Sequence, residues 1–109
     1  MDTTPDILNR VRMAAALRRL YLPHALRQMA RPERMISAAE VRAVIEQGEV
    51  IEDYPADPRG HNCLMIGVGT DGRPIHVVCS PKEDYLAIIT AYIPEAGKWS
   101  ADFRVRAKP

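Results

Sequence analysis

The spacing of apolar residues changes its period once along the chain. Over residues 6–22 the apolar positions recur at helical intervals with arginines mostly between them, which predicts an amphipathic helix. Pro23 suits the first position of a second helix. We expect that helix to end at Pro32, because proline cannot continue the hydrogen bonds of a helical backbone.

A third helix is predicted to begin at Ser37, since Ser37 and Glu40 have the spacing of a capping box, and to end at Gly48. Beyond Gly48 the apolar residues form short runs that are typical of strands. The predicted strands cover residues 50–54, 63–69, 73–79 and 85–93. Because helices precede strands, we expect an α+β fold with N-terminal helices packed on one face of a curved, mostly antiparallel four-stranded sheet.

The dipeptide Asp71-Gly72 predicts a hairpin between the second and third of these strands. A two-residue turn would place Gly67 opposite His76 and would gather an apolar set on the other face. That set, expected to receive the helices, comprises Leu64, Ile66, Val68, Ile75, Val77 and Cys79. His76 would then be displayed on the face away from the helices, with space beside it because glycine has no side chain.

The last predicted strand divides in the same way. Its helix-facing residues are expected to be Ala87, Ile89, Ala91 and Ile93. Thr90 and Tyr92 would point to the other side, where either can share a face with His76 if the two strands are antiparallel. Such a polar patch on an open sheet face indicates a functional site, and the alternative is a structural cluster of satisfied hydrogen bonds.

Four residues of metal-binding type, His61, Cys63, His76 and Cys79, raise the question of a zinc site. In the predicted hairpin, Cys63 and Cys79 face opposite sides and His76 lies roughly 13 Å from Cys63. Zinc ligands must all lie about 2.0–2.3 Å from one ion, so this set does not close around a metal. The same geometry disfavours a disulfide. We therefore predict no metal and no cofactor.

The size and composition of the chain indicate one compact domain. It has 109 residues, of which 47% are hydrophobic, enough for a modest core. No apolar stretch approaches the roughly 18 residues of a membrane span, and the N-terminus lacks the layout of a secretory signal. We expect a cytoplasmic protein with no membrane partner.

The net charge of +1 conceals an uneven distribution. Residues 1–34 contain seven arginines against Asp2, Asp6 and Glu33, a balance of +4, so the remaining 75 residues sum to −3. A clustered arginine surface suits phosphate or an acidic protein partner. The alternative is an ordinary solvated helix surface.

The chain resembles a bacterial family called domain of unknown function 4258 in four segments that follow one another in order. They read PHALRQM, ISAAEVRAVIEQGEVIEDYP, CLMIGVGTDGRPIHVV and IITAYIP. The resemblance covers about residues 23–99, so we interpret residues 23–109 as one RelE-like α+β domain and residues 1–22 as an amphipathic helical extension.

That family is similar in turn to the RelE-like toxins and the barnase/colicin ribonuclease group, especially the mRNA-cutting toxins of the motility-quorum-sensing-regulator type. The resemblance implies an active site on the open sheet face, RNA as substrate and a cognate antitoxin protein as partner. It leaves the oligomeric state open. Its EDYP strand end corresponds to residues 52–55.

The resemblance also implies roles for individual residues. His76 and His24 correspond to the family's two histidines and are expected to be catalytic, with Tyr92 as the polar neighbour of His76. The alternative for His24, beside Pro23 at a helix start, is a local packing or hydrogen-bonding residue. The residues expected to bind the substrate are Arg27, Arg34, Arg59 and Thr90.

These residue types suit cleavage of RNA without a metal ion. The reaction needs a base for the 2′-hydroxyl, an acid for the leaving oxygen and cations at the phosphate, and imidazole, with a pKa of about 6.5, can serve as base or acid. We therefore expect a metal-independent endoribonuclease acting on mRNA, the toxin of a type II toxin–antitoxin pair. The alternative is a non-enzymatic module that binds protein or RNA, since the three lysines, Lys82, Lys98 and Lys108, do not make the lysine-rich surface of many RelE-like toxins.

Overall fold

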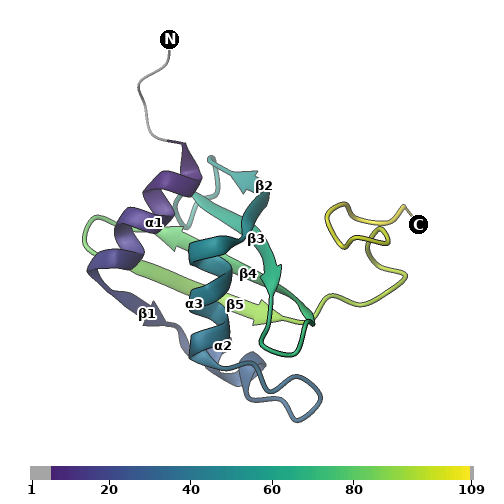
Figure 1. The fold of residues 1–109 in the computed structure, drawn as a ribbon. Helices are drawn as coiled ribbons and strands as arrows, with labels where there is room; N and C mark the ends of the chain where they lie inside the picture. Colours follow the sequence, from purple (N-terminus) through teal and green to yellow (C-terminus); the bar gives the residue numbers. More distant parts are fainter. Residues whose placement is uncertain (1–5, 109) are drawn as a thin grey trace.

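The computed structural model describes residues 6–108 and has an α+β fold (Figure 1). The helices are α1 (Ile7–Leu17), α2 (Pro23–Met29) and α3 (Ala38–Gln47). The strands are β1 (Arg19–Tyr21), β2 (Glu49–Tyr54), β3 (Asn62–Val68), β4 (Pro74–Pro81) and β5 (Leu86–Tyr92). They form one sheet in the order β1-β5-β4-β3-β2. None of the helices in this part of the chain is long and apolar enough to cross a membrane.

The sheet is mixed and has five strands, so the prediction of four mostly antiparallel strands is only partly correct. The additional strand, β1, lies within the stretch predicted as one helix and runs parallel to β5. Helix α1 ends at Leu17 because Arg18 is extended, with its N–H bonded to the carbonyl of Ala14. A strand of three residues carries no recognisable period of its own, so its existence depends on pairing with β5.

Helix α3 begins with the predicted capping box. The Ser37 side chain accepts a hydrogen bond from the Glu40 N–H (3.1 Å), and the Glu40 carboxylate accepts one from the Ser37 N–H (3.0 Å). The same carboxylate accepts a bond from the N–H of Thr70 (3.1 Å) and lies 3.6 Å from the Arg73 guanidinium. Glu40 is buried, and it ties the start of α3 to the turn between β3 and β4.

The β3–β4 turn has three residues rather than two, so the predicted register is wrong by one position. The Gly69 N–H donates to the Arg73 carbonyl (2.8 Å), which leaves residues 70–72 as the loop. Gly72 takes φ +84, the left-handed conformation that closes a three-residue hairpin loop. His76 therefore lies opposite Ile66 and not opposite Gly67.

This shift gives each β4 residue a different partner in β3. Successive residues of a strand face opposite sides of the sheet, so a slip of one residue brings the other side of β3 opposite a given β4 residue. The helix-facing side now carries Met65 opposite Val77 and Cys63 opposite Cys79. Gly67 also lies on this side, where a Cβ atom would come within 2.8 Å of Val44 in α3. A glycine is thus required by the close approach of the helix.

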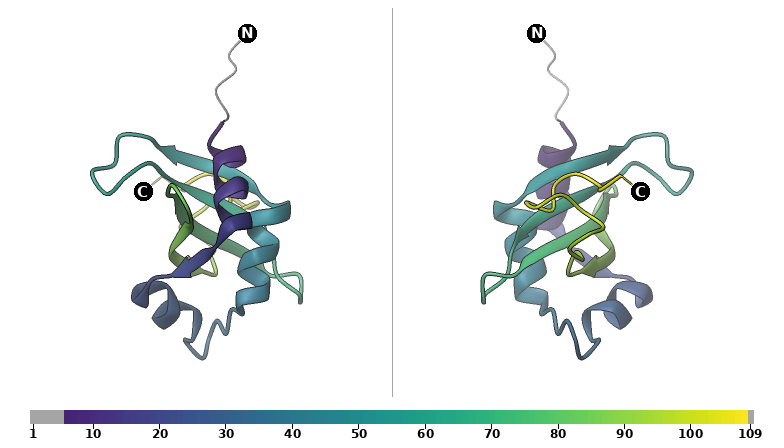
Figure 2. Two further views of the ribbon diagram at one scale, coloured as in Figure 1. Left: turned by 90° about the vertical axis from the view of Figure 1, so that its left-hand side faces the viewer. Right: turned by 90° about the vertical axis from the view of Figure 1, so that its right-hand side faces the viewer.

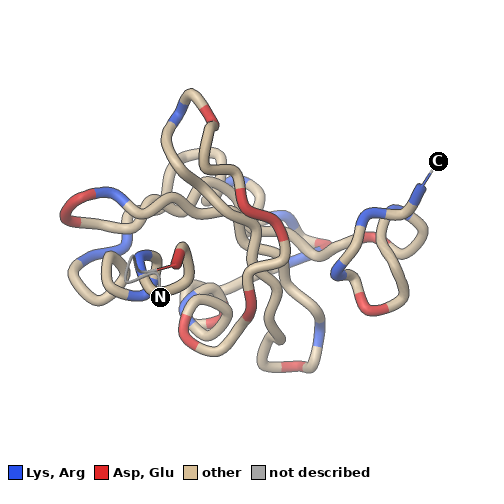
Figure 3. The backbone as a smooth tube through the Cα atoms, turned by 90° about the horizontal axis from the view of Figure 1, so that it is seen from above, with Lys and Arg blue, Asp and Glu red and all other residues tan. Residues whose placement is uncertain are grey.

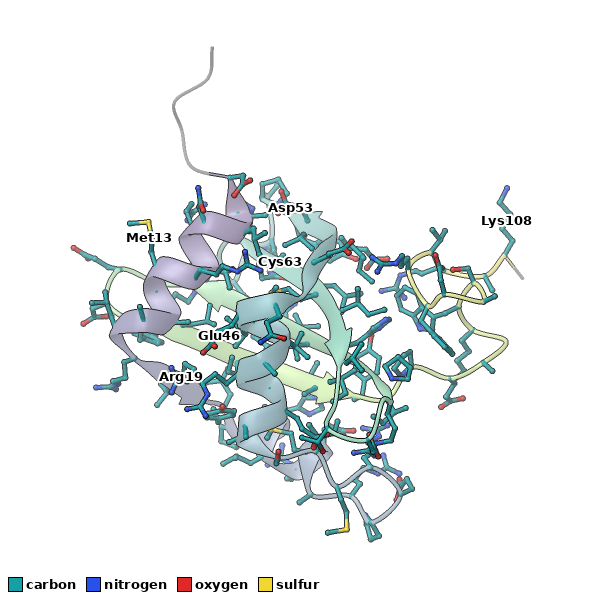
Figure 4. The ribbon with its side chains drawn as sticks, in the orientation of Figure 1. Met13, Arg19, Glu46, Asp53, Cys63 and Lys108 are labelled. Atoms are coloured by element: carbon teal, nitrogen blue, oxygen red, sulfur yellow. The ribbon has the colours of Figure 1, made fainter. Side chains whose placement is uncertain are left out.

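The two cysteines face each other, which corrects the prediction that they point to opposite faces. Both side chains are fully buried, and their sulfur atoms lie 4.0 Å apart as free thiols. Figure 4 shows Cys63 on the sheet beneath the helix layer. The hydrogen bond with the Cys63 thiol and burial both raise the pKa of Cys79, and both cysteines belong to the apolar core.

Strand β5 contains a bulge that the sequence pattern missed. The register with β4 shifts after Thr90, which pairs with Val78, so that Ile88 and not Ile89 lies opposite Cys79. Ala91 faces the helices as predicted, whereas Leu86 and Ile88 replace Ala87 and Ile89 in the core. The extra residue reverses the alternation for the first half of the strand.

Helices α1 and α3 cover one face of the sheet, and the segment after β5 turns back to the opposite side of the molecule (Figure 2). That segment reaches the sheet through Trp99 and Phe103, which contact His76. The middle of the sheet is therefore covered from both sides, and Leu64 and Ile66 are buried although they face away from the helices.

Removing the Glu40 carboxylate should destabilise the protein far more than removing an exposed carboxylate from the same helix. Glu40→Ala leaves the Ser37 and Thr70 amides without their charged acceptor, and we expect the free energy of unfolding to fall by about 2–4 kcal/mol. Glu46, which only approaches Arg42 at the surface, is the matched control, with an expected change below about 0.5 kcal/mol for Glu46→Ala. Urea unfolding at neutral pH measures both, and equal effects would contradict the role of Glu40.

Candidate functional site

The candidate site lies on the sheet face opposite the helices, in two rows of residues that run across the strands. One row, in order from β2 to β5, is Glu49, Ile66, His76 and Tyr92. The next row is Glu52, Leu64, Val78 and Thr90. The first row is polar except at Ile66, because His76 places a polar side chain at the centre of the sheet. The second row is polar only at its two ends.

His76 and Tyr92 form the centre of the site. They are directly opposite on β4 and β5, and the His76 Nδ1 lies 3.1 Å from the Tyr92 hydroxyl. The other ring nitrogen, Nε2, donates to the carbonyl oxygen of Phe103 (2.8 Å), because a carbonyl can only accept. Nδ1 of a neutral imidazole is then the acceptor, and the Tyr92 hydroxyl is its donor. The prediction that Tyr92 shares a face with His76 is confirmed.

A second polar group lies beside this pair at the edge strand β2. The Glu52 carboxylate accepts two hydrogen bonds from the Arg106 guanidinium, at 2.9 and 3.0 Å, and a third from the Tyr54 hydroxyl. Two parallel bonds of this kind hold a carboxylate and a guanidinium in one geometry. The charge of Glu52 raises the pKa of His76 and the charge of Arg106 lowers it, so both members of this ion pair are electrostatically linked to the imidazole.

The site is closed, which corrects the expectation of a histidine displayed on an open face. His76 has no exposed surface. The Trp99 ring stands almost perpendicular to the imidazole, at 87° and 4.5 Å between centroids, and the Tyr92 ring centroid lies 5.2 Å from that of the imidazole. The covering residues come from the segment after β5, whose approach the strand pattern does not encode.

Burial is the main cause of the shifted pKa values of His76 and Tyr92. It lowers the pKa of His76, although the bond to Phe103 and the charge of Glu52 act in the opposite direction. It also raises the pKa of Tyr92. For Glu52, burial alone would raise the pKa, but the bonds from Arg106 and Tyr54 outweigh it and lower the pKa. At neutral pH the site therefore holds a neutral imidazole, a protonated phenol and a carboxylate.

The other predicted site residues are spread over a wider surface. Thr90 lies in the row of Glu52 and is half-buried. Arg59, whose guanidinium is paired with Asp57, lies with Lys82 beside Ser80, whose side chain faces the same way as His76. Ser80 is four residues from His76 on β4, so this basic end of the face is roughly 13 Å from the imidazole. The Lys82 ammonium also donates to the Arg59 carbonyl (3.0 Å).

The structure does not bring the two predicted histidines into contact. His24 is exposed at the start of α2, where Arg27 is exposed one turn later. Arg34, in the loop before α3, bonds to the Gln28 side chain, and its charge is among those that act on the Tyr92 hydroxyl. Of the three, only Arg34 has an electrostatic link to the His76–Tyr92 pair.

The N-terminal arginines do not form one free basic surface. Arg12 donates to the carbonyls of Ile45 and Gly48 at the end of α3 (3.0 and 3.1 Å), and Arg10 lies 2.7 Å from His61. The other arginines with internal partners are Arg19, Arg31 and Arg34. Figure 3 shows Lys and Arg distributed around the backbone and interspersed with Asp and Glu. The solvated-surface interpretation fits most of them better than a phosphate-binding cluster.

Three members of the site, Glu52, Tyr54 and Arg106, were not predicted as site residues. Glu52 and Tyr54 alternate along β2, so their shared face could have been noticed in the pattern. Arg106 lies 54 residues from Glu52 in the chain, and no local signal connects them. The same holds for Trp99. No group of three or more His, Cys, Asp or Glu residues that could hold a metal ion occurs within residues 6–108.

Comparison with protein-family models matches residues 21–93 to the family described as Domain of unknown function (DUF4258). No curated protein and no solved structure matches the chain. The matched region is more than half of the chain and contains Glu52, Tyr54, His76 and Tyr92. Helix α1 and residues 94–108, with Trp99 and Arg106, lie outside it.

The burial of neutral His76 predicts a specific pH dependence of stability. In the unfolded chain His76 binds a proton near its ordinary pKa of 6.5, whereas the lowered pKa keeps the folded form neutral. Acid therefore favours unfolding, and below pH 6.5 the free energy of unfolding should fall by up to about 1.4 kcal/mol per pH unit until the folded pKa is reached.

The measurement is urea unfolding from pH 7.5 to pH 5 for the wild type and for His76→Gln. Glutamine does not titrate, so the variant should lose the part of the pH dependence of stability that His76 causes. The parts caused by other titrating groups should remain. An identical pH dependence in both proteins would show that His76 is not a buried neutral imidazole.

Proposed function

The chain belongs to the DUF4258 family, and we propose that it is an endoribonuclease that cleaves mRNA without a metal ion, as the toxin of a bacterial toxin–antitoxin pair. The observation that carries the proposal is the His76–Tyr92 pair, with its 3.1 Å hydrogen bond, beside the Glu52–Arg106 pair on the face away from the helices. The proposal also rests on the resemblance of the sequence to RelE-like toxins.

In the proposed reaction His76 takes the proton of the ribose 2′-hydroxyl. A base must be unprotonated at working pH, and an imidazole with an ordinary pKa of about 6.5 is mostly in that form at neutral pH. Tyr92, whose pKa is raised, keeps its proton and can donate it or a hydrogen bond to a phosphate or leaving oxygen. No cofactor takes part.

The basic end of the face would hold the RNA strand. Arg59 and Lys82 lie beside Ser80, which is roughly 13 Å from His76 along β4, a distance that suits a phosphate of a neighbouring nucleotide rather than the one cleaved. Arginine and lysine contribute to single-strand binding by displacing counterions from phosphates. Thr90 lies on β5 between this basic end and Tyr92. Its hydroxyl would donate to the RNA backbone that runs between the two.

A second candidate function is a non-enzymatic binding module. The observation that favours it is that both ring nitrogens of His76 are used in internal hydrogen bonds and that the residue is fully buried. In this case the polar face would be a structural cluster, and a protein or RNA partner would bind elsewhere on the surface.

Replacement of His76 separates the two functions. A general base typically accelerates a reaction by about 10²- to 10⁴-fold. His76→Ala should therefore abolish RNA cleavage and the inhibition of bacterial growth on expression. The cleavage rate is divided by the folded fraction from thermal unfolding of the same sample, because loss of a buried hydrogen-bonded group also destabilises the fold by about 1–3 kcal/mol. His24→Ala, at an exposed histidine, should keep wild-type cleavage. A folded His76→Ala protein with wild-type specific activity would support the binding module instead.

RNA binding should depend on salt and on the basic end of the sheet face. We expect the affinity for a labelled single-stranded RNA to fall steeply between 50 and 200 mM salt, and Arg59→Gln to weaken binding and reduce the salt slope by about 0.7, the value for one phosphate contact on a single strand. Arg42→Gln removes the same charge from the exposed surface of α3 and should have little effect. Binding that is independent of salt, or equally weakened by both substitutions, would contradict this site.

A further inference from the structure

Residues 94–108, called here the C-terminal strap, close the His76 site. The strap places the Trp99 ring 4.5 Å from the imidazole and the Phe103 carbonyl 2.8 Å from its Nε2. His76 has no exposed surface, and only 8% of Trp99 is exposed. While the strap stays in place, no RNA atom can reach the imidazole.

The strap is a small loop closed on itself. The Ser100 N–H donates to the Val105 carbonyl (2.7 Å), and the Ala107 N–H donates to the Lys98 carbonyl (3.0 Å). Figure 1 shows it beside the sheet, attached to the fold through the end of β5. Because these bonds lie within the strap, it can leave the sheet as one unit without losing them.

The contacts that hold the strap to the sheet are few and mostly polar. Besides Trp99 and the Phe103 carbonyl, Arg104 pairs with Glu49 and Arg106 pairs with Glu52. Arg104 and Glu49 are 40% and 65% exposed, and an ion pair at that exposure stabilises a structure only slightly, whereas Arg106 makes two hydrogen bonds to the largely buried Glu52. The strap is therefore held by the buried Trp99, by the bond to His76 and by two ion pairs that end on the same two rows of residues as the candidate site.

The strap is also strained at its contact with His76. Phe103, whose carbonyl accepts the imidazole N–H, has φ +61, in the left-handed region that is costly for a bulky side chain. Residues with such strain cluster at ligand clamps and switch regions, and here the strained residue is the one whose carbonyl accepts from His76.

We propose that the C-terminal strap is an autoinhibitory device, which keeps the His76 site closed and must lift from the sheet to admit RNA. The strap lies outside the part of the chain that matches the family, residues 21–93. That the strap excludes RNA in particular rests on the proposed function; that it opens and closes over His76 does not.

The test uses the full chain with Arg104→Glu, which turns the attraction to Glu49 into repulsion. Trp99 is the only tryptophan, so its fluorescence reports the strap directly. We expect acrylamide quenching of Trp99 and modification of His76 by diethyl pyrocarbonate, read by mass spectrometry, to rise on the order of three- to tenfold. The charge-swapped protein Glu49→Arg/Arg104→Glu should return both to wild-type values. His24, already exposed, is the internal standard for the reagent.

Binding and cleavage of a single-stranded RNA are then measured on the same proteins. Arg104→Glu lowers the net charge by two, which by itself weakens RNA binding, so tighter binding or faster cleavage can only come from opening the site. Arg42→Glu makes the same charge change on α3 and should weaken binding slightly. Far-UV circular dichroism confirms that each variant is folded.

The outcomes separate the strap from the proposed function. Unchanged Trp99 quenching and His76 modification in a folded Arg104→Glu protein, or a rise that the charge swap does not reverse, would overturn the strap. A reversible rise in both without any gain in RNA binding or cleavage would support the strap and count against the ribonuclease. Reversible gains in all four measurements would support both.

Discussion

The arrangement of this protein depends on how α3 is joined to the β3–β4 hairpin. The buried Glu40 carboxylate bonds to Ser37 at the start of the helix and to Thr70 in the turn, while Gly67 lets Val44 pack against the strand backbone. A charged group in the interior is stable only when it is fully hydrogen-bonded, so the turn has little freedom to move relative to the helix. This holds the hairpin in the register that decides which side chains meet on each face.

The register in turn separates two clusters that are close in the sequence. Cys63 and Cys79 meet in the core under the helices, and His76 meets Tyr92 on the opposite face. Because adjacent residues of a strand face opposite sides, an apolar core and a polar site can be built from the same two strands. The bulge in β5 serves this division, since it brings Ile88 to the core and keeps Tyr92 opposite His76.

The polar face would be an ordinary exposed surface without the segment that follows β5. Trp99 and the Phe103 carbonyl remove His76 from water, and Arg106 neutralises Glu52. Burial then lowers the pKa of the imidazole and raises that of the phenol, so the ionisation of two residues inside the family match is set by a segment outside it. The chemistry of the site and its accessibility are therefore governed by the same contacts.

The sequence alone determined what depends on neighbouring residues: the capping box at Ser37, Pro23 at the start of α2, the succession of helices and strands, and a position for Tyr92 that can face His76. It did not determine the three-residue turn, the β5 bulge or the short strand β1, because each costs little locally and is selected by packing against another element. It also could not place Arg106 on Glu52 or Trp99 on His76, since contacts between residues far apart in the chain leave no periodic trace. Tertiary structure therefore decided whether the histidine was exposed, because burial is a property of what covers a residue and not of the strand that carries it.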